Sequence, residues 1–238
     1  MNHFSLYGSF VIALLILTSG CGWRKDFIDR AEYPLSKTII RKMHLMQTDQ
    51  NYPSLIRIFK KENVLEIWKY TKNEKYVLLK SYKICAWSGK LGSKIEDGDK
   101  QSPEGFYKVR LENLNPNSQH YLSINIGFPN EFDKANHRTG KDIMIHGGCS
   151  SAGCYAMNDI QMQEIYAIIR DSLQGKIQDY VQIQSFPFRM TQKNMNIYKS
   201  HPEYNFWQII QIGYNYFEKT NKEPIVDVFN KYYVFLKS

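Results

Sequence analysis

Apolar and polar residues alternate with a period of two through much of the first half of the chain, which is typical of half-buried strands. The clearest run is 64–69, where successive residues switch between apolar and polar faces. We predict strands over 55–59, 64–70, 76–84, 105–111, 121–126, 142–146 and 180–184. The first two flank a turn at 60–63 and the third follows a turn at 71–74, so these three are expected to form a hairpin meander.

Two later segments have the period of a helix instead. The first is expected to begin after Asn158, which can cap it with Gln161 in the capping-box position, and to end at Gly175. Its apolar stripe consists of Ile165, Ile168, Ile169 and Leu173. The second helix is expected over 205–219, with an inner face of Phe206, Ile209, Ile210, Gly213 and Phe217. The pattern therefore predicts an α+β fold that is rich in strands, in mixed sheets or a sandwich, with carboxy-terminal helices packed at one side.

The amino terminus carries an unbroken apolar run at 10–17, followed by small residues and then Cys21. A membrane span needs about 20 apolar residues, so this shorter run is typical of the core of an export signal. The sequence LTSGC resembles a bacterial lipoprotein cleavage box, in which Cys21 becomes the acylated first residue. An ordinary cleaved signal and an uncleaved anchor are the alternatives, and Arg24 and Lys25 count against the anchor.

These features divide the chain into three parts. We expect residues 1–21 to be the export or lipoprotein signal, residues 22–53 a tether and lead-in, and residues 54–235 the folded body that includes the carboxy-terminal helices. The expected location is the periplasm, with the protein held at the membrane through its lipid anchor.

The composition agrees with a globular protein, because 43% of the residues are hydrophobic and 14% are aromatic. The net charge of +8 comes from basic residues that are scattered without a dense run, so nucleic acid is not an expected partner. We expect the Lys60-Lys61 pair to lie at a solvated hairpin tip. A diffuse positive field would favour a polyanionic partner such as a cell wall or a lipid surface.

Cysteine usage indicates a reactive thiol. If Cys21 is acylated, three cysteines remain, namely Cys85, Cys149 and Cys154. Because three is an odd number, an oxidising compartment leaves at least one thiol free.

The segment around Cys154 combines the features that a nucleophilic thiol needs. A predicted strand ends at His146, a loop rich in glycine and serine follows, and the capped helix starts shortly after Cys154. A nearby imidazole and a helix amino terminus would lower the thiol pKa below about 8.5. His146 can accept the thiol proton and return it to a leaving amine. The amides of Gly153 and Cys154 can bind the oxyanion, and Ser151 can hold the loop in shape.

Two other interpretations of this segment stay open from the residues alone. His146, Cys149 and Cys154 have a spacing that could ligate zinc, with Cys85 or His137 as a fourth ligand. Alternatively, Cys149 and Cys154 could form a structural disulfide. A serine nucleophile is excluded, because the stretch 148–152 lacks the second glycine of G-x-S-x-G.

The string HGGCSSAGCYAM resembles the HG and S-x-G-C signature of the L,D-transpeptidase (YkuD-type) catalytic domain, in its YafK-like branch. The resemblance extends to ICAWSGKLG around Cys85, QSPEGFYKV from Gln101 and the long stretch from Leu114, and it covers roughly 54–235. It implies that Cys154 is the nucleophile and His146 the proton donor and acceptor. It also places Gly147 at the HG glycine, and Ser151 and Gly153 in S-x-G.

This chain departs from the wider family at two positions. Ala152 and Ala156 stand where the common S-H-G-C-[IV]-R pattern carries His and Arg. Arg138, near the end of the loop at 127–140, is a candidate to take over a contact with a substrate carboxylate. The alternative is that Arg138 is a solvated loop residue.

The resemblance implies a reaction on peptidoglycan stem peptides that needs no metal or organic cofactor. Cys154 would attack the carbonyl on the L-centre of meso-diaminopimelate and form a thioester. An amine acceptor then gives a crosslink or a protein attachment, whereas water gives hydrolysis, as in branch members that cut peptidoglycan-attached lipoprotein free. The remaining alternative is a wall-binding or zinc-binding module without catalytic activity.

Overall fold

The computed structural model describes residue 1 and residues 29–236 of the chain. Apart from residue 1, the predicted signal at 1–21, with its Cys21, lies outside the described residues. The elements, in chain order, are η1 (Arg30–Glu32), α1 (Lys37–Leu45), β1 (Ser54–Phe59), β2 (Val64–Tyr70), β3 (Tyr76–Lys83), β4 (Gly105–Val109), η2 (Leu111–Asn113), β5 (Leu114–Asn115), β6 (Ser123–Asn125), α2 (Glu131–Ala135), β7 (Met144–His146), β8 (Tyr155–Ala156), α3 (Asp159–Gln174), β9 (Val181–Phe186), α4 (Gln192–Ile197), α5 (Tyr204–Thr220), β10 (Ile225–Phe229) and β11 (Tyr232–Leu236).

Five strands form the larger sheet in the order β3-β2-β1-β9-β4. β1, β2 and β3 are antiparallel neighbours, which confirms the predicted meander. β9 comes from much later in the chain, and it pairs in parallel with β1 and antiparallel with β4. The sheet therefore joins segments that are more than 100 residues apart.

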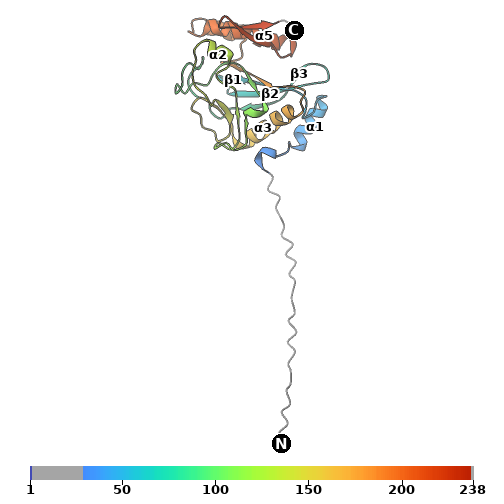
Figure 1. Ribbon diagram of the computed structural model, residues 1–238. Coiled ribbons are helices and arrows are strands. Elements are labelled where there is room, and N and C mark those ends of the chain that lie inside the picture. Colours follow the sequence, from blue (N-terminus) through green and yellow to red (C-terminus); the bar gives the residue numbers. More distant parts are fainter. Residues whose placement is uncertain (2–28, 237–238) are drawn as a thin grey trace.

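This sheet lies between α3 on one face and α5 with the carboxy-terminal hairpin on the other (Figure 1). All six residues of β1 are buried. Ile56 and Ile58 belong to the core cluster that includes α3, whereas Phe59 packs in the cluster around α5. A strand that is covered on both faces contributes to two cores at once, which is why β1 carries no exposed residue.

The smaller sheet has the order β5-β6-β7-β8. β7 and β8 are parallel, with Ile145 opposite Tyr155 and His146 opposite Ala156. The strand β8 was not predicted, because two residues are too few to show a period. Its pairing with β7 brings the two ends of the loop at 147–154 together.

The two long helices α3 and α5 confirm the two helices that were predicted from the sequence. Together with the sheets they confirm the α+β class. The Asn158 side chain accepts a hydrogen bond from the Gln161 amide at 2.8 Å, and Gly175 follows the last residue of α3. α5 extends one residue beyond the prediction at each end. The sequence analysis did not predict the hairpin β10–β11 that follows α5.

Lys60 corrects the expectation of a solvated hairpin tip. Its side chain has no exposed surface, and it forms a 2.9 Å ion pair with Glu104, which is equally buried. The ammonium also donates to the carbonyl oxygens of Lys90, Gly92 and Ser102. These four acceptors satisfy the hydrogen-bonding capacity of the buried ammonium. Of the two lysines that were expected in solvent, only Lys61 is exposed.

Residues 29–53 pack on the folded body. Ala31 and the α1 residues Ile39 and Met43 belong to the same core cluster as α3. The Gln163 side chain of α3 donates to the Arg30 carbonyl at 2.6 Å, and Arg170 donates to the carbonyl of Ala31. The chain therefore enters the fold at η1, well before the first strand.

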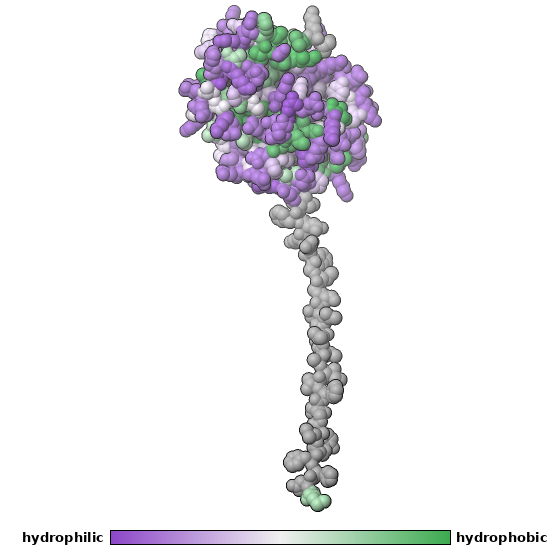
Figure 2. Space-filling view, viewed as in Figure 1, coloured by the Kyte–Doolittle hydropathy of each residue, from purple (hydrophilic) through white to green (hydrophobic). Residues whose placement is uncertain are grey.

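The surface in Figure 2 is mostly hydrophilic on the face that it shows. Within residues 29–236, no helix has the length and apolar character that a membrane span requires. Exposed apolar side chains occur on α5 and on the terminal hairpin, and they include Ile212, Ile225, Phe229, Tyr232 and Leu236.

Replacing Lys60 tests the buried ion pair. We expect Lys60→Met to lower the free energy of unfolding by about 3–5 kcal/mol, because Glu104 would keep its charge in the interior without its partner. Urea denaturation followed by tryptophan fluorescence measures this change. Lys61→Met is the matched control and should stay within about 0.5 kcal/mol of the wild type. Equal effects of the two substitutions would contradict the buried pair.

Candidate active site

The parallel pairing of β7 with β8 brings Cys154 close to His146. Cys154 directly precedes β8, and His146 is the last residue of β7. The thiol of Cys154 accepts a hydrogen bond from the Met144 amide at 3.4 Å and donates to the Asp142 carbonyl at 3.7 Å. The thiol thus lies along the edge of β7, the strand that ends in His146.

Burial raises the pKa of the Cys154 thiol above its ordinary value of 9.0. The amide of Met144 and the charge of Lys94 lower this pKa, whereas Asp142 raises it, and burial has the largest effect. The expected lowering by a helix amino terminus is therefore wrong for this structure. The strand β8 and two further residues separate Cys154 from the start of α3, so the helix does not begin at the thiol.

His146 is buried, with only 4% of its surface exposed. Its Nδ1 lies 2.5 Å from the carbonyl oxygen of Gly147. A carbonyl oxygen can only accept, so Nδ1 carries the proton and Nε2 remains as the acceptor. Burial lowers the pKa of His146 below 6.5, and the nearby His120 lowers it further, while the bond to Gly147 acts in the opposite direction.

Gly147 lies at a point where no side chain fits. A Cβ atom there would come within 2.5 Å of Asp159 Oδ1 and 2.9 Å of the His120 carbonyl oxygen. Its amide donates to the carbonyl oxygens of His120 and Leu122. The carbonyl oxygen of Gly147 orients the His146 ring. The close contacts around Gly147 are a structural reason for a glycine directly after the histidine.

Ser151 and Gly153 shape the loop before the cysteine. The Ser151 hydroxyl donates to the Cys154 carbonyl oxygen at 2.7 Å. The Gly153 amide donates to the Ser88 hydroxyl at 2.6 Å, so this predicted oxyanion donor is already bonded. Ser102 donates to the same Cys154 carbonyl at 3.1 Å. The sequence carries no local signal for Ser88 and Ser102, because they lie more than 40 residues before the motif.

A disulfide joins Cys85 to Cys149, with 5.0 Å between the Cα atoms. This bond overturns the interpretation of a Cys149–Cys154 disulfide. It also removes the Cys149 thiolate that the proposed zinc array would need. Among the cysteines that the structure describes, Cys154 alone is free.

Cys154 and His146 line one cavity of about 470 Å³. The other residues around this catalytic cavity are Ser118, His120, Asp142, Met144, Ser150, Ser151 and Ala152. His120 was not predicted, since nothing in its local sequence links it to a segment 26 residues later. Ala152, at the position of the histidine in the wider family, lines the cavity without a polar group.

Arg138 does not line the catalytic cavity. Its guanidinium forms a 2.9 Å ion pair with the fully buried Asp133 and donates to the Ser93 hydroxyl. The ring of Phe132 lies beneath it, 4.8 Å from the guanidinium carbon. The structure therefore places Arg138 in a mostly buried network, neither at the substrate cavity nor in solvent.

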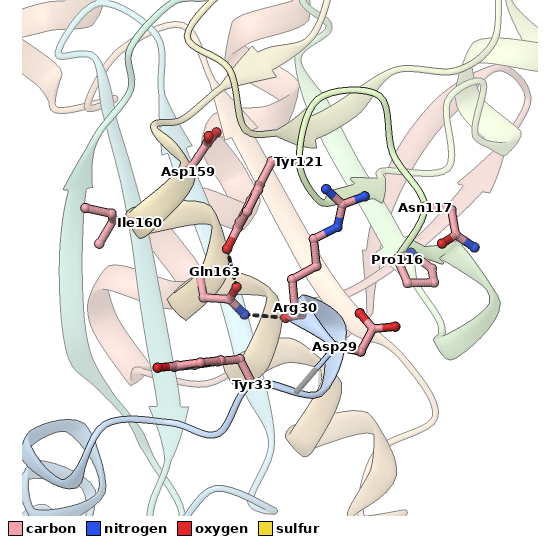
Figure 3. Close-up of a pocket in the computed structure, with 9 residues that line it drawn as sticks. All are labelled: Asp29, Arg30, Tyr33, Pro116, Asn117, Tyr121, Asp159, Ile160 and Gln163. Atoms are coloured by element: carbon pink, nitrogen blue, oxygen red, sulfur yellow. Dashed lines mark hydrogen bonds between the residues drawn. The ribbon is translucent and has the colours of Figure 1, made fainter. Parts of the chain in front are cut away.

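A larger cavity of about 950 Å³ lies between η1, the loop at 116–121 and the start of α3 (Figure 3). Neither Cys154 nor His146 lines this lead-in cavity. Asp159 connects it to the catalytic loop, because its carboxylate accepts from the Gly148 amide at 2.9 Å. The loop at 116–121 separates the two cavities, since Tyr121 lines this one and His120 lines the other.

Comparison with known proteins agrees with this geometry. Residues 53–183 match the YkuD family, the L,D-transpeptidase catalytic domain. The chain belongs to this family. The YafK proteins of Escherichia coli K12 and O157:H7 are each 47% identical to it over 186 residues, which make up 78% of this chain and 74% of theirs. The resemblance stated from the motifs is confirmed.

Solved structures with a similar arrangement are more distant in sequence. The helical cell shape determining protein Pgp2 from Campylobacter jejuni, as its K307A mutant, is 19% identical with a TM-score of 0.46, covering 74% of this chain and 72% of that one. Bd1075 from Bdellovibrio bacteriovorus is 17% identical with a TM-score of 0.40, covering 60% of this chain and 51% of that one.

The disulfide gives a direct test of how the catalytic loop is held. We expect the variant Cys85→Ser/Cys149→Ser to lose about 2–4 kcal/mol of unfolding free energy, because the bond closes a long loop in the unfolded chain. Chemical denaturation with and without reductant measures the loss. Reductant should lower the stability of the wild type to the level of the variant and leave the variant unchanged. A variant that reductant destabilises as much as the wild type would rule out this pairing.

Proposed function

We propose that this protein is an exported cysteine acyltransferase that acts on peptidoglycan stem peptides through a thioester on Cys154. The observation that carries the proposal is the pairing of a free thiol with a buried imidazole in one cavity, within the signature of the L,D-transpeptidase family. The bond from Nδ1 to Gly147 supports His146 as the base, because it leaves Nε2 available.

The raised pKa of the thiol and the lowered pKa of His146 favour a resting pair in which both groups are neutral. In the first step, the proton of the Cys154 thiol passes to Nε2 of His146, and the sulfur attacks the carbonyl on the L-centre of meso-diaminopimelate. The Cys154 amide is the remaining predicted donor to the oxyanion, since the Gly153 amide is bonded to Ser88. His146 then protonates the leaving amine, and a thioester remains.

The thioester has two fates that share this first step. An acceptor amine gives a new amide, which makes the protein a transferase, whereas water gives hydrolysis. The second fate would make the protein an L,D-endopeptidase or amidase that releases peptidoglycan-linked lipoprotein. The two fates differ only in which nucleophile reaches the thioester, so a test of the activity has to detect both the transfer product and the hydrolysis product.

The proposed location is the periplasm, with Cys21 as a lipidated anchor. The apolar run at 10–17 and the sequence LTSGC support this location. The Cys85–Cys149 disulfide supports export as well, because disulfides persist mainly in oxidising compartments.

Purified stem peptides test the reaction. We expect the wild type to convert muropeptides that end in meso-diaminopimelate and a further residue, with Cys154→Ala at least about a thousandfold slower. His146→Gln should also lose activity, while His137→Gln, at an exposed histidine outside the cavity, should retain it. Mass spectrometry with and without an added amine separates crosslinked dimers from hydrolysed products. Equal activity of wild type and Cys154→Ala would exclude the thioester.

Lipid labelling tests the anchor. We expect radiolabelled palmitate to enter the protein in growing cells and Cys21→Ser to abolish the label. Cys154→Ala serves as the control, because it removes a different free thiol and should keep the label. An unlabelled wild type would exclude the lipoprotein assignment and leave a cleaved signal or an uncleaved anchor.

A further inference from the structure

His120 contacts the proposed base with its side chain. Its ring centroid lies 4.7 Å from that of His146, and the two planes are tilted by 32°. His120 is exposed at the catalytic cavity, whereas the His146 ring is almost entirely buried. The His120 imidazole therefore lies against the buried His146 ring on the side that is nearer to solvent.

The main chain of His120 also contacts the residue that follows His146. Its carbonyl oxygen accepts a 3.0 Å hydrogen bond from Gly147, the residue whose own carbonyl binds Nδ1 of His146. A Cβ at Gly148 would lie 3.4 Å from His120 Nδ1, an ordinary contact distance, so the His120 ring also lies beside the backbone of this loop. One residue thus contacts the base through its ring and the residue after the base through its backbone.

The loop that presents His120 is held in an unusual conformation. Tyr121 has a φ of 69°, in the left-handed region that a bulky residue rarely adopts. Its hydroxyl donates to Gln163 of α3 at 2.5 Å, and the Arg30 guanidinium lies over its ring (Figure 3). Strained backbone of this kind persists only where surrounding contacts enforce it, and it is concentrated at functional sites.

Two imidazoles at this separation repel each other when both are protonated. A proton on the buried His146 would also lose its hydration. Asp142 and Cys154 are the other titratable groups in the cavity, Asp159 lies behind Gly147, and Lys94 acts on the thiol. Among these groups, His120 is the one whose ring packs against the His146 ring.

We propose that His120 is a positioning residue that packs against the His146 ring and keeps its imidazole neutral, with Nε2 free to take the proton of Cys154. The inference rests on the proposed function. In the step that it supports, the S–H bond of Cys154 breaks and an N–H bond forms at His146 Nε2. His120 exchanges no proton in this step.

The test is an NMR titration of the histidine side chains in the full folded chain, which needs no substrate. The signals of His146 are identified by their loss in His146→Gln. We expect His120→Gln to raise the proton affinity of His146 roughly threefold to fivefold, the size expected for two unit charges 4.7 Å apart in water. His120→Ala is a second variant with the same expected direction, and His137→Gln is the control that should leave His146 unchanged.

The pH dependence of the reaction gives a second readout. Because a neutral His146 accepts the proton, the acid limb of kcat/KM should move to higher pH in His120→Gln. An unchanged His146 titration in both His120 variants would overturn the proposal. If Cys154→Ala keeps full activity, the proposed function fails, and the titration still decides whether His120 controls the charge of His146.

Discussion

The ion pair between Lys60 and Glu104 is the interaction on which the arrangement of this site depends. Both side chains are fully buried. Glu104 also accepts from the Gly92 amide at 2.6 Å and from the Trp207 indole at 2.8 Å, so the pair joins the meander, the segment before β4 and α5. Either charge left in this interior without its partner would cost several kcal/mol of folding free energy. The three parts of the chain therefore have to meet at this ion pair.

The segment that the pair holds is the one that shapes the catalytic loop. The carbonyl oxygen of Ser102 accepts a hydrogen bond from the Lys60 ammonium, and the Ser102 hydroxyl donates to the carbonyl oxygen of Cys154. The Ser102 amide bonds to the Ser88 carbonyl, and the Ser88 hydroxyl accepts from Gly153. The disulfide at Cys85 ties the start of the same segment to the loop. Cys154, the proposed nucleophile, is thus positioned from a part of the chain far from its own motif.

This arrangement changes the chemical picture of the resting site. The sequence suggested a thiol activated in advance by a helix amino terminus, but α3 starts after β8 and burial raises the pKa of Cys154. His146 is buried as well, and its pKa is lowered. In the proposed reaction, a neutral thiol beside a neutral imidazole means that the proton moves when the substrate carbonyl is present. A thiol kept in its protonated form is also less open to oxidation in an exposed cavity.

Local signals in the sequence determined the meander, the two long helices and the choice of Cys154 and His146. A period of two or of 3.6 residues, a cap at Asn158 and a motif of neighbouring residues are all readable over short distances. Lys60, Cys149, His120 and Arg138 could not be assigned in this way. Their partners lie between 5 and 64 residues away, and only tertiary packing decides whether a polar side chain meets water, a sulfur, a ring or an opposite charge.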